Sequence, residues 1–435
     1  MRFLHAADLH LDSPLRGLDR YPGAPVERLR GATRRALEWL VDRALAEPVD
    51  FVLLAGDIYD RDWQDFHTGL FFREQMVRLD RAGIRVFMVQ GNHDAQGVIS
   101  RQLPLPANCH VFSSRAAHTE RLAGLACAIH GRSFRDRVED ADLVPSYPDP
   151  VPGWFNIGLL HTSLTGREGH DPYAPTDLAA LTAKGYDYWA LGHVHARELV
   201  AESPRVVFPG NLQGRHANET GPKGCELVSV TAGRIEAEFV PLDSVRWGQV
   251  TLDLAGIDRL EGLAEPFRAG LAPLLAGAGD RLHAVRVNLR GCTPLHQTEA
   301  NSPGTLEAAI RAAAQDLTEA EVWVERVRLD LSTPLDRAQA AERPDAVGEL
   351  IRLVAPLAAD PAALGARVRA ELEPLLKAMP AELGEDDGLP SLDQADTLAA
   401  LLRDAEATVL ARLAAGAPAG SPPEVQAAGQ TEGQP

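Results

Sequence analysis

The sequence is short of cysteine and of long apolar runs. Only 4 of its 435 residues are cysteine, and none of them forms a Cys-x-x-Cys pair, which excludes the usual cysteine-ligated zinc sites and predicts free thiols. No apolar stretch approaches the roughly 20 residues that cross a bilayer. Acidic and histidine residues stand near the amino terminus, where a signal peptide needs an apolar segment. We therefore expect a cytoplasmic protein without membrane contact.

Positive charge is also scarce. The formal net charge is -18 at pH 7, and most of the excess acid falls in residues 246–435. This balance excludes a generally basic surface of the kind that binds nucleic acid. A nucleic acid would have to be held by individual arginines and by metal ions, because the overall field of the protein repels it.

What the sequence does contain is a series of polar residues that follow short apolar runs. Five such runs, among them residues 51–54, 86–89 and 157–160, have the length and composition of buried strands. Because open α/β sheets bind ligands at the carboxyl ends of their strands, we expect the polar side chains to meet at one edge. These residues are Asp8, His10, Asp57, Asn92, His93, Asp94, His161, His193 and His195.

Seven of these residues are predicted metal ligands. They offer nitrogen and oxygen donors without cysteine, which favours two divalent ions such as Mn, Fe or Zn. Two ions bring four positive charges and the two aspartates remove two, so the centre favours an anionic phosphoester. Such ions polarise phosphoryl oxygens and lower the pKa of a shared water, so no protein nucleophile is needed. The predicted ligands are Asp8, His10, Asp57, Asn92, His161, His193 and His195.

His93 is the candidate catalytic side chain. Adjacent residues at a strand end point in different directions, so His93 can face the substrate while Asn92 faces a metal. We expect His93 to protonate the leaving oxygen, and Asp94 to orient His93 and raise its pKa. Arg215 and His216 are candidates for contacting a phosphate or a DNA strand. A plain surface loop is an equally open interpretation of this last pair.

The order of strand-like and helix-like stretches predicts that the chain is divided into several structural regions. Residues 1–245 alternate between the two, which favours an α/β fold, a four-layer αββα sandwich. Residues 246–335 predict a small α/β cap without metal ligands. Residues 336–415 predict a helical region, whose apolar stripe from Leu398 to Leu413 packs on its own domain or meets a partner helix. Residues 416–435 are rich in Ala, Gly, Pro and Gln, and predict a disordered tail.

The ordered set of motifs resembles the calcineurin-like metallophosphoesterase superfamily. Within it, residues 2–12 and 56–60 resemble the SbcD-type DNA repair exonucleases, and residues 209–216 resemble the YhaO-type branch. The resemblance implies a Mn-dependent phosphodiesterase that acts on DNA ends, usually as a 3′-to-5′ exonuclease. It also implies that the cap contacts DNA and that the helical region docks an SbcC-like ATPase. Dimerisation of the chain is left open.

The resemblance also implies a role for each motif residue. One ion would be held by Asp8, His10, Asp57 and His195, and the other by Asp57, Asn92, His161 and His193, with His93 as the catalytic histidine. The chain departs from the pattern at Asp60, where related nucleases can carry a second histidine.

Two alternatives to a DNA exonuclease stay open. One is a small-molecule or protein phosphoesterase that uses the same metals. The other is an adaptor for DNA ends or for the ATPase, in which nuclease activity is secondary; the apolar stripe near the carboxyl terminus favours it.

Overall fold

The structure is a computed structural model that describes residues 1–13, 23–60, 66–95, 103–165, 172–277, 279–378 and 394–414. The predicted disordered tail lies outside the described residues. The chain divides into two compact units. The first comprises Met1–Gln249, Ala272–Arg286 and Leu317–Glu325, and the second comprises Val250–Leu271, Val287–Asp316 and Arg326–Pro435. The domain boundaries drawn from the sequence stay predictions.

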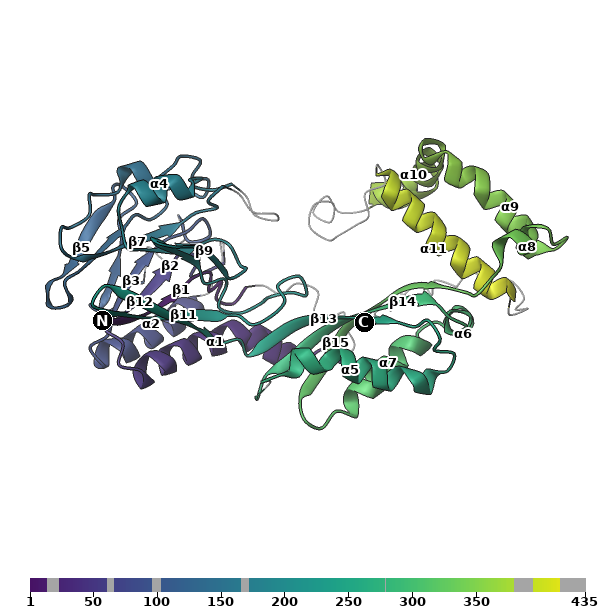
Figure 1. Cartoon of the computed structure of the whole chain (residues 1–435), viewed down its shortest axis with the longest axis horizontal. Helices are drawn as coiled ribbons and strands as arrows, with labels where there is room; N and C mark the ends of the chain where they lie inside the picture. The colour runs from purple at the N-terminus through teal and green to yellow at the C-terminus, as the bar shows by residue number, and fades with distance from the viewer. Residues whose placement is uncertain are drawn as a thin grey trace, which may run out of the picture. The chain divides into compact units, whose positions relative to one another are not determined.

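Two six-stranded sheets form the centre of the first unit (Figure 1). The first has the order β12-β11-β1-β2-β3-β4, and the second β5-β6-β7-β8-β10-β9. The strands of the first sheet are β1 (Arg2–Ala6), β2 (Phe51–Ala55), β3 (Arg85–Val89), β4 (Cys109–Val111), β11 (Gly224–Thr231) and β12 (Arg234–Pro241). Those of the second are β5 (His118–Leu122), β6 (Cys127–Gly131), β7 (Phe155–His161), β8 (Tyr188–Gly192), β9 (Glu198–Glu202) and β10 (Arg205–Phe208).

The central strands are apolar on both faces because both faces are covered. Phe3, Phe51 and Phe87 come from neighbouring strands and fill the space between the two sheets, where Phe3 stacks on Phe51 with ring centroids 5.0 Å apart. The alternate residues Leu4 and Val52 face the helices. A run that is apolar at every position is typical of parallel strands buried in this way.

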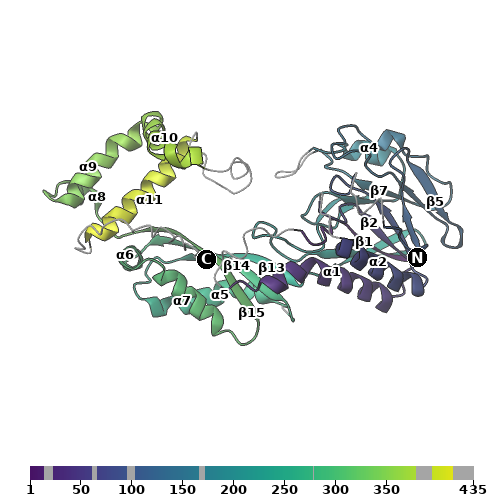
Figure 2. The same ribbon diagram turned by 180° about the vertical axis from the view of Figure 1, so that it is seen from behind.

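Helices cover the outer face of each sheet, which completes four layers. The helices α1 (Val26–Ala46) and α2 (Phe66–Arg81) pack side by side on the first sheet, and α4 (Leu178–Ala183) packs on the second (Figure 1, Figure 2). The predicted α/β sandwich is confirmed. Two short 3-10 helices, Ala123–Leu125 and Val144–Ser146, lie in connections of the second sheet.

A three-stranded sheet with the order β13-β14-β15 follows the sandwich in the sequence. Its strands are β13 (Val245–Asp253), β14 (Leu282–Cys292) and β15 (Glu321–Ser332), and the unit boundary falls inside each of them. The other elements of this stretch are the 3-10 helix Leu260–Leu263 and the helices α5 (Ala264–Leu275), α6 (Leu295–Asn301) and α7 (Thr305–Gln315).

The described residues of the predicted helical region, 336–378 and 394–414, form four helices: α8 (Arg337–Ala341), α9 (Ala346–Ala359), α10 (Pro361–Ala378) and α11 (Ala395–Ala414). Here the stripe predicted for α11 is partly wrong. Leu398 is buried, but so are Glu406, Leu410 and Ala411, whereas Leu401 and Val409 of the predicted stripe are exposed. Glu406 can turn inward because Arg337 donates two hydrogen bonds to its carboxylate. In the described residues, no helix combines the length and apolar character needed to span a bilayer.

His5 on β1 is a buried polar residue that joins the two sheets through hydrogen bonds to β8. Its Nε2 lies 3.1 Å from the Leu191 carbonyl and therefore donates to it, which leaves Nδ1 to accept from the Tyr188 hydroxyl at 3.0 Å. Burial lowers the pKa of His5 to about 3, against the smaller opposing effect of the Leu191 hydrogen bond. The folded protein thus holds His5 neutral, while the unfolded chain protonates it below its ordinary pKa of 6.5.

Acidification should therefore destabilise this unit. The unfolded state binds the extra proton, so stability falls as pH drops from 6.5 toward 3, by about 2 kcal/mol between pH 6.5 and pH 5. His5→Gln can keep both hydrogen bonds and should show a flatter dependence. Urea unfolding of the chelator-treated protein, followed by tryptophan fluorescence, measures this, because all six tryptophans belong to the first unit. Equal pH dependence in both proteins would contradict the prediction.

Candidate metal centre

The backbone of the polar strand ends adopts an unusual conformation. Asp8, His10, Asp57 and His193 have φ angles of 52°, 42°, 52° and 104°, in the left-handed region that favours glycine. Each such residue costs on the order of 1–3 kcal/mol and persists only where its surroundings hold it. Here backbone bonds do so, since Asp8 N–H donates to Gly56 and His10 N–H to Asp57, both at 3.0 Å. The fold thus maintains strained turns that present four of the predicted ligands.

Two glycines allow the loops after β2 and β3 to approach β7. A Cβ added to Gly56, whose φ is +95°, would lie 2.5 Å from Nδ1 of His161. A Cβ added to Gly91 would overlap both the Asp57 carboxylate and the His161 ring. Glycine is therefore required at these positions, because the His161 ring lies against both of them and the Asp57 carboxylate lies against Gly91.

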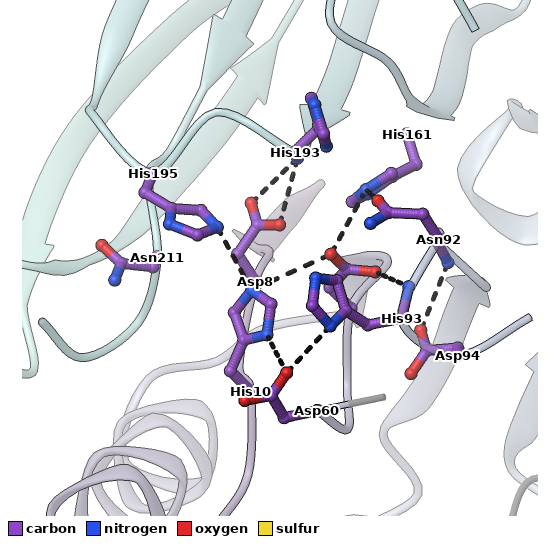
Figure 3. A network of polar contacts seen from close by, with 12 residues as sticks. Asp8, His10, Asp60, Asn92, His93, Asp94, His161, His193, His195 and Asn211 are labelled. Carbon is purple, nitrogen blue, oxygen red and sulfur yellow. Dashed lines mark hydrogen bonds and ion pairs between the residues drawn. The ribbon is translucent and has the colours of Figure 1, made fainter. Parts of the chain in front are cut away.

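The seven predicted ligands come together at one edge of the two sheets (Figure 3). Five of them form two groups that share Asp8, namely Asp8 with His10 and His195, and Asp8 with Asp57 and His161; within each group the ligand atoms lie within 4.8 Å of one another. Asn92 joins the second group, with Oδ1 3.0 Å from Nε2 of His161. His193 lies beside the second group, with its ring centroid 5.2 Å from that of His161. The backbone N–H of His193 donates to the Asp8 carboxylate.

Asp57 belongs to the second group and also lies close to His10 of the first. Its Oδ2 is 3.8 Å from Nε2 of His10 on one side and 3.5 Å from Nε2 of His161 on the other. On the His10 side, the Nε2 atoms of His10 and His195 face each other at 3.2 Å. Two imidazole nitrogens that each bind the same zinc ion at about 2.0–2.1 Å are separated from each other by a similar distance. The position of Asp57 is the one expected of a carboxylate that bridges two ions.

The ionisable groups of the site favour the binding of cations. Asp8 and Asp57 are fully buried, and burial raises the pKa of both carboxyls; repulsion by Asp57 raises that of Asp8 further. Burial, followed by the nearby charge of Arg215, also lowers the pKa of His10 well below its ordinary value. Adjacent desolvated carboxylates and neutral imidazoles are stabilised together by divalent ions, which take both as ligands.

His93 faces an acid other than the one predicted. Its Nδ1 lies 2.8 Å from Oδ1 of Asp60. Burial lowers the pKa of His93, but the contact with Asp60 and the charge of Asp57 outweigh it, and the net pKa is raised. Burial likewise opposes ionisation of Asp60, yet the close contact with His93 and the hydrogen bond from Ser13 lower its pKa to about 2. His93 and Asp60 therefore form an ion pair beside the ligand groups.

The prediction that Asp94 orients His93 was wrong. The Asp94 carboxylate accepts hydrogen bonds from the backbone N–H groups of Ile58, Tyr59 and Gly91, at 3.1, 3.0 and 3.2 Å. Burial, followed by repulsion from Asp57, raises its pKa to about 7. A turn closed by the bond from Ala95 N–H to the Gly91 carbonyl directs Asp94 inward. Asp94 ties the loop after β2 to the loop after β3.

Glu219 is a residue that sequence reasoning missed. Its Oε1 lies 2.7 Å from Nδ1 of His195, and its Oε2 accepts from Asn211 Nδ2 at 2.9 Å and from Arg215 N–H at 2.7 Å. Burial opposes its ionisation, but the hydrogen bond from His195 and the charge of Arg215 hold the pKa of Glu219 well below its ordinary value. Such a carboxylate fixes the ring so that Nε2 faces the metal. The Ala55 carbonyl, 2.8 Å from Nδ1, orients His161 in the same way.

The two predicted substrate contacts occupy different environments. The Arg215 side chain is mostly buried and lies 3.2 Å from Glu219 and 3.9 Å from Asp60. The His216 side chain is 56% exposed, with Nε2 3.6 Å from Glu219. Arg215 thus supports the site from its edge, and contact of either residue with a phosphate stays a prediction.

Comparison with known proteins identifies the family. Residues 1–197 match the calcineurin-like phosphoesterase family, and residues 247–332 match the middle domain of the metallophosphoesterase YhaO. The chain is 36% identical over 337 residues to the "Uncharacterized metallophosphoesterase YhaO" of Bacillus subtilis (strain 168), covering 77% of this chain and 82% of that protein. The chain belongs to the YhaO family of calcineurin-like metallophosphoesterases. The resemblance drawn from the motifs is confirmed.

More distant relatives of this YhaO family member include a DNA repair protein and a nuclease subunit. The chain is 24% identical over 273 residues to the "DNA double-strand break repair protein Mre11" of Methanopyrus kandleri, covering 56% of this chain and 57% of that protein. It is 24% identical over 282 residues to one of the subunits of the nuclease SbcCD of Escherichia coli (strain K12), covering 54% of this chain and 67% of that protein. Family membership supports a phosphoester hydrolase that binds divalent metals.

Removing the central carboxylate should disrupt metal binding. Because Asp57 faces both ligand groups, Asp57→Asn should weaken binding of Mn²⁺ at least about tenfold, whereas the wild type should take up two ions per chain. Metal analysis after chelator treatment and equilibrium dialysis measures the stoichiometry. His216→Asn, at an exposed position near the site, is the control and should retain two ions. Wild-type affinity in Asp57→Asn would contradict the prediction.

Glu219 offers a second, subtler test. Glu219→Gln keeps the size of the side chain but removes the charge that orients His195, so Mn²⁺ affinity should fall roughly 10- to 100-fold. The circular dichroism spectrum should not change. Glu198→Gln, an acid on β9 closer in sequence to His195, provides the matched control. Unchanged affinity in Glu219→Gln would show that the carboxylate does not position the ligand.

Proposed function

We propose that this protein is a DNA repair exonuclease, a metal-dependent phosphodiesterase that removes nucleotides in the 3′-to-5′ direction. The observation that carries the proposal is the placement of the His93–Asp60 pair beside two overlapping ligand groups. This arrangement occurs on a chain whose sequence is similar to a DNA double-strand break repair protein and to a component of a nuclease.

The proposal assigns ligands to two ions, which we take to be Mn²⁺. Bound there, the ions would neutralise the phosphodiester and activate water for attack. One group would consist of Asp8, His10, Asp57 and His195, and the other of Asp57, Asn92, His161 and His193. Each carboxylate and imidazole is held by a turn or a partner described above, so the ligands need little rearrangement.

His93 would act as the general acid. Its Nδ1 is engaged by Asp60, which leaves Nε2 to donate a proton to the leaving oxygen. The side chain is 17% exposed, so a bound substrate can reach it. Asp60 favours the protonated ring and receives a hydrogen bond from Ser13 at 2.5 Å. The acid at this position thus has a role even though it replaces the second histidine of related nucleases.

The charge of the protein favours a second candidate function. A net charge of -18 repels DNA, whereas a small phosphoester or a phosphoprotein would meet less repulsion at the same centre. A small-molecule or protein phosphoesterase is therefore the alternative. DNA binding would depend on the ions and on local contacts, among which we place Arg215, His216 and the cap of residues 246–335.

We also propose that the helical region, residues 336–415, docks an SbcC-like ATPase. Leu353 on α9 and Leu375 on α10 are each 60% exposed, and such apolar side chains are typical of a helix-binding surface. In this proposal the partner assembles with the nuclease on DNA ends. An adaptor role with secondary nuclease activity would use the same surface.

The nuclease proposal predicts Mn²⁺-dependent shortening of linear duplex DNA. With separate 5′ and 3′ end labels, the wild type should release the 3′ label first. His93→Ala should lower the rate by about 10²- to 10⁴-fold, because a positioned acid contributes that much, while Mn²⁺ binding is retained. His67→Ala, an exposed histidine on α2, controls for loss of an imidazole.

The same assay separates the alternatives. A cyclic nucleotide, a phosphomonoester and DNA are offered in parallel under Mn²⁺, Mg²⁺ and Zn²⁺. Turnover of the small substrates without any attack on DNA would replace the proposal with the phosphoesterase alternative. Full activity of His93→Ala on DNA would contradict the acid role.

A further inference from the structure

A second cluster of metal-binding side chains lies where the two sheets end. His110 comes from β4, the terminal strand of the first sheet, and His118 and Glu120 come from β5, the terminal strand of the second. One ligand atom from each of the three lies within 4.8 Å of the others. The cluster shares no residue with the candidate metal centre.

The strand geometry brings these side chains together. His118 and Glu120 are two residues apart on β5 and so face the same side. The Nε2 atoms of His110 and His118 are 2.9 Å apart, and Nδ1 of His110 lies 3.8 Å from the Glu120 carboxylate. Two neutral imidazoles at this distance share one proton, with one ring donating and the other accepting.

Buried packing holds both rings in place. The Phe112 ring is 4.8 Å from that of His110 and 4.7 Å from that of His118, centroid to centroid. Phe112 is itself buried against Gly131, where an added Cβ would lie 2.5 Å from its ring. The two imidazoles are therefore presented by a fixed support, although His110 and Glu120 remain about 29% exposed and open to solvent.

We propose that His110, His118 and Glu120 bind a Zn²⁺ ion that links the edges of the two sheets. Two imidazoles and a carboxylate are a common three-residue zinc set, with water as the fourth ligand. The ion would replace the shared proton between the two Nε2 atoms, and the proton would move to Nδ1 of the donating ring, so none is released. At bond lengths of about 2.0–2.1 Å, the two nitrogens need to separate by only a few tenths of an ångström.

The ligand set selects zinc over manganese. Imidazole suits zinc, and a given site binds Zn²⁺ more tightly than Mn²⁺. One feature opposes the cation: the Arg85 guanidinium lies 3.5 Å from the other oxygen of Glu120 and packs over the Phe87 ring. Arg85 is 44% exposed and can turn toward solvent. Its removal should strengthen zinc binding.

The location suggests what the ion does. Residues 112–117 connect β4 to β5, so the ligands stand at both ends of the crossing between sheets. β4 has only three residues and pairs with β3. An ion bound here would fasten a short terminal strand to the neighbouring sheet, and would stabilise the folded state by mass action.

The test counts zinc ions. Full-length protein is stripped with chelator and titrated with Zn²⁺, followed by native mass spectrometry and thermal unfolding. The wild type should bind one more ion than His118→Asn, and its melting temperature should show a zinc-dependent increase that this variant lacks. Glu74→Gln, an exposed acid on α2, is the control for Glu120→Gln, which should bind the additional ion more weakly.

A variant that should bind zinc more tightly provides a second test in case His118→Asn folds poorly. Arg85→Gln should bind the additional zinc roughly two- to fivefold more tightly, as expected for removal of a partly exposed charge. Equal zinc stoichiometry in the wild type and in folded His118→Asn, or no change in Arg85→Gln, would overturn the proposal. Zinc stoichiometry is measured without DNA cleavage. If the nuclease proposal fails, the expected difference in bound zinc between the wild type and His118→Asn would therefore remain.

Discussion

The structure depends on the burial of two carboxylates, Asp8 and Asp57, side by side at the carboxyl edge of the first sheet. Burial raises the pKa of both carboxyls, and the backbone of both residues adopts a strained conformation. A fold that maintains such turns against this cost implies a compensating interaction. Divalent cations held by the carboxylates and the surrounding histidines would provide that compensation.

The groups around the ligands serve the same purpose. Glu219 and the Ala55 carbonyl fix the orientation of His195 and His161, and Asp94 joins two ligand loops through backbone hydrogen bonds. His93 stands outside the ligand set and is paired with Asp60. The proposed function therefore assigns metal binding and proton transfer to separate side chains, each held by its own partner.

The sequence predicted the sandwich, and the seven predicted ligands lie close together because each lies at or just after the carboxyl end of one of five strands. Strand ends are local features, and parallel strands place them at a common edge. It could not predict Glu219, which lies in a loop 24 residues beyond His195. Asp94 was predicted as the partner of His93 because it is the next residue in the sequence. The turn after Asn92 points Asp94 away from His93, and Asp60 is the acid that His93 contacts. The buried face of α11 was misjudged because Arg337, a distant partner, allows Glu406 to be buried.

The central claim is best tested by a crystal structure of the protein soaked in manganese. The account predicts two ions about 3.5–4 Å apart, with the Asp57 carboxylate in contact with both. A single ion at saturating manganese, or two ions that Asp57 does not join, would contradict it.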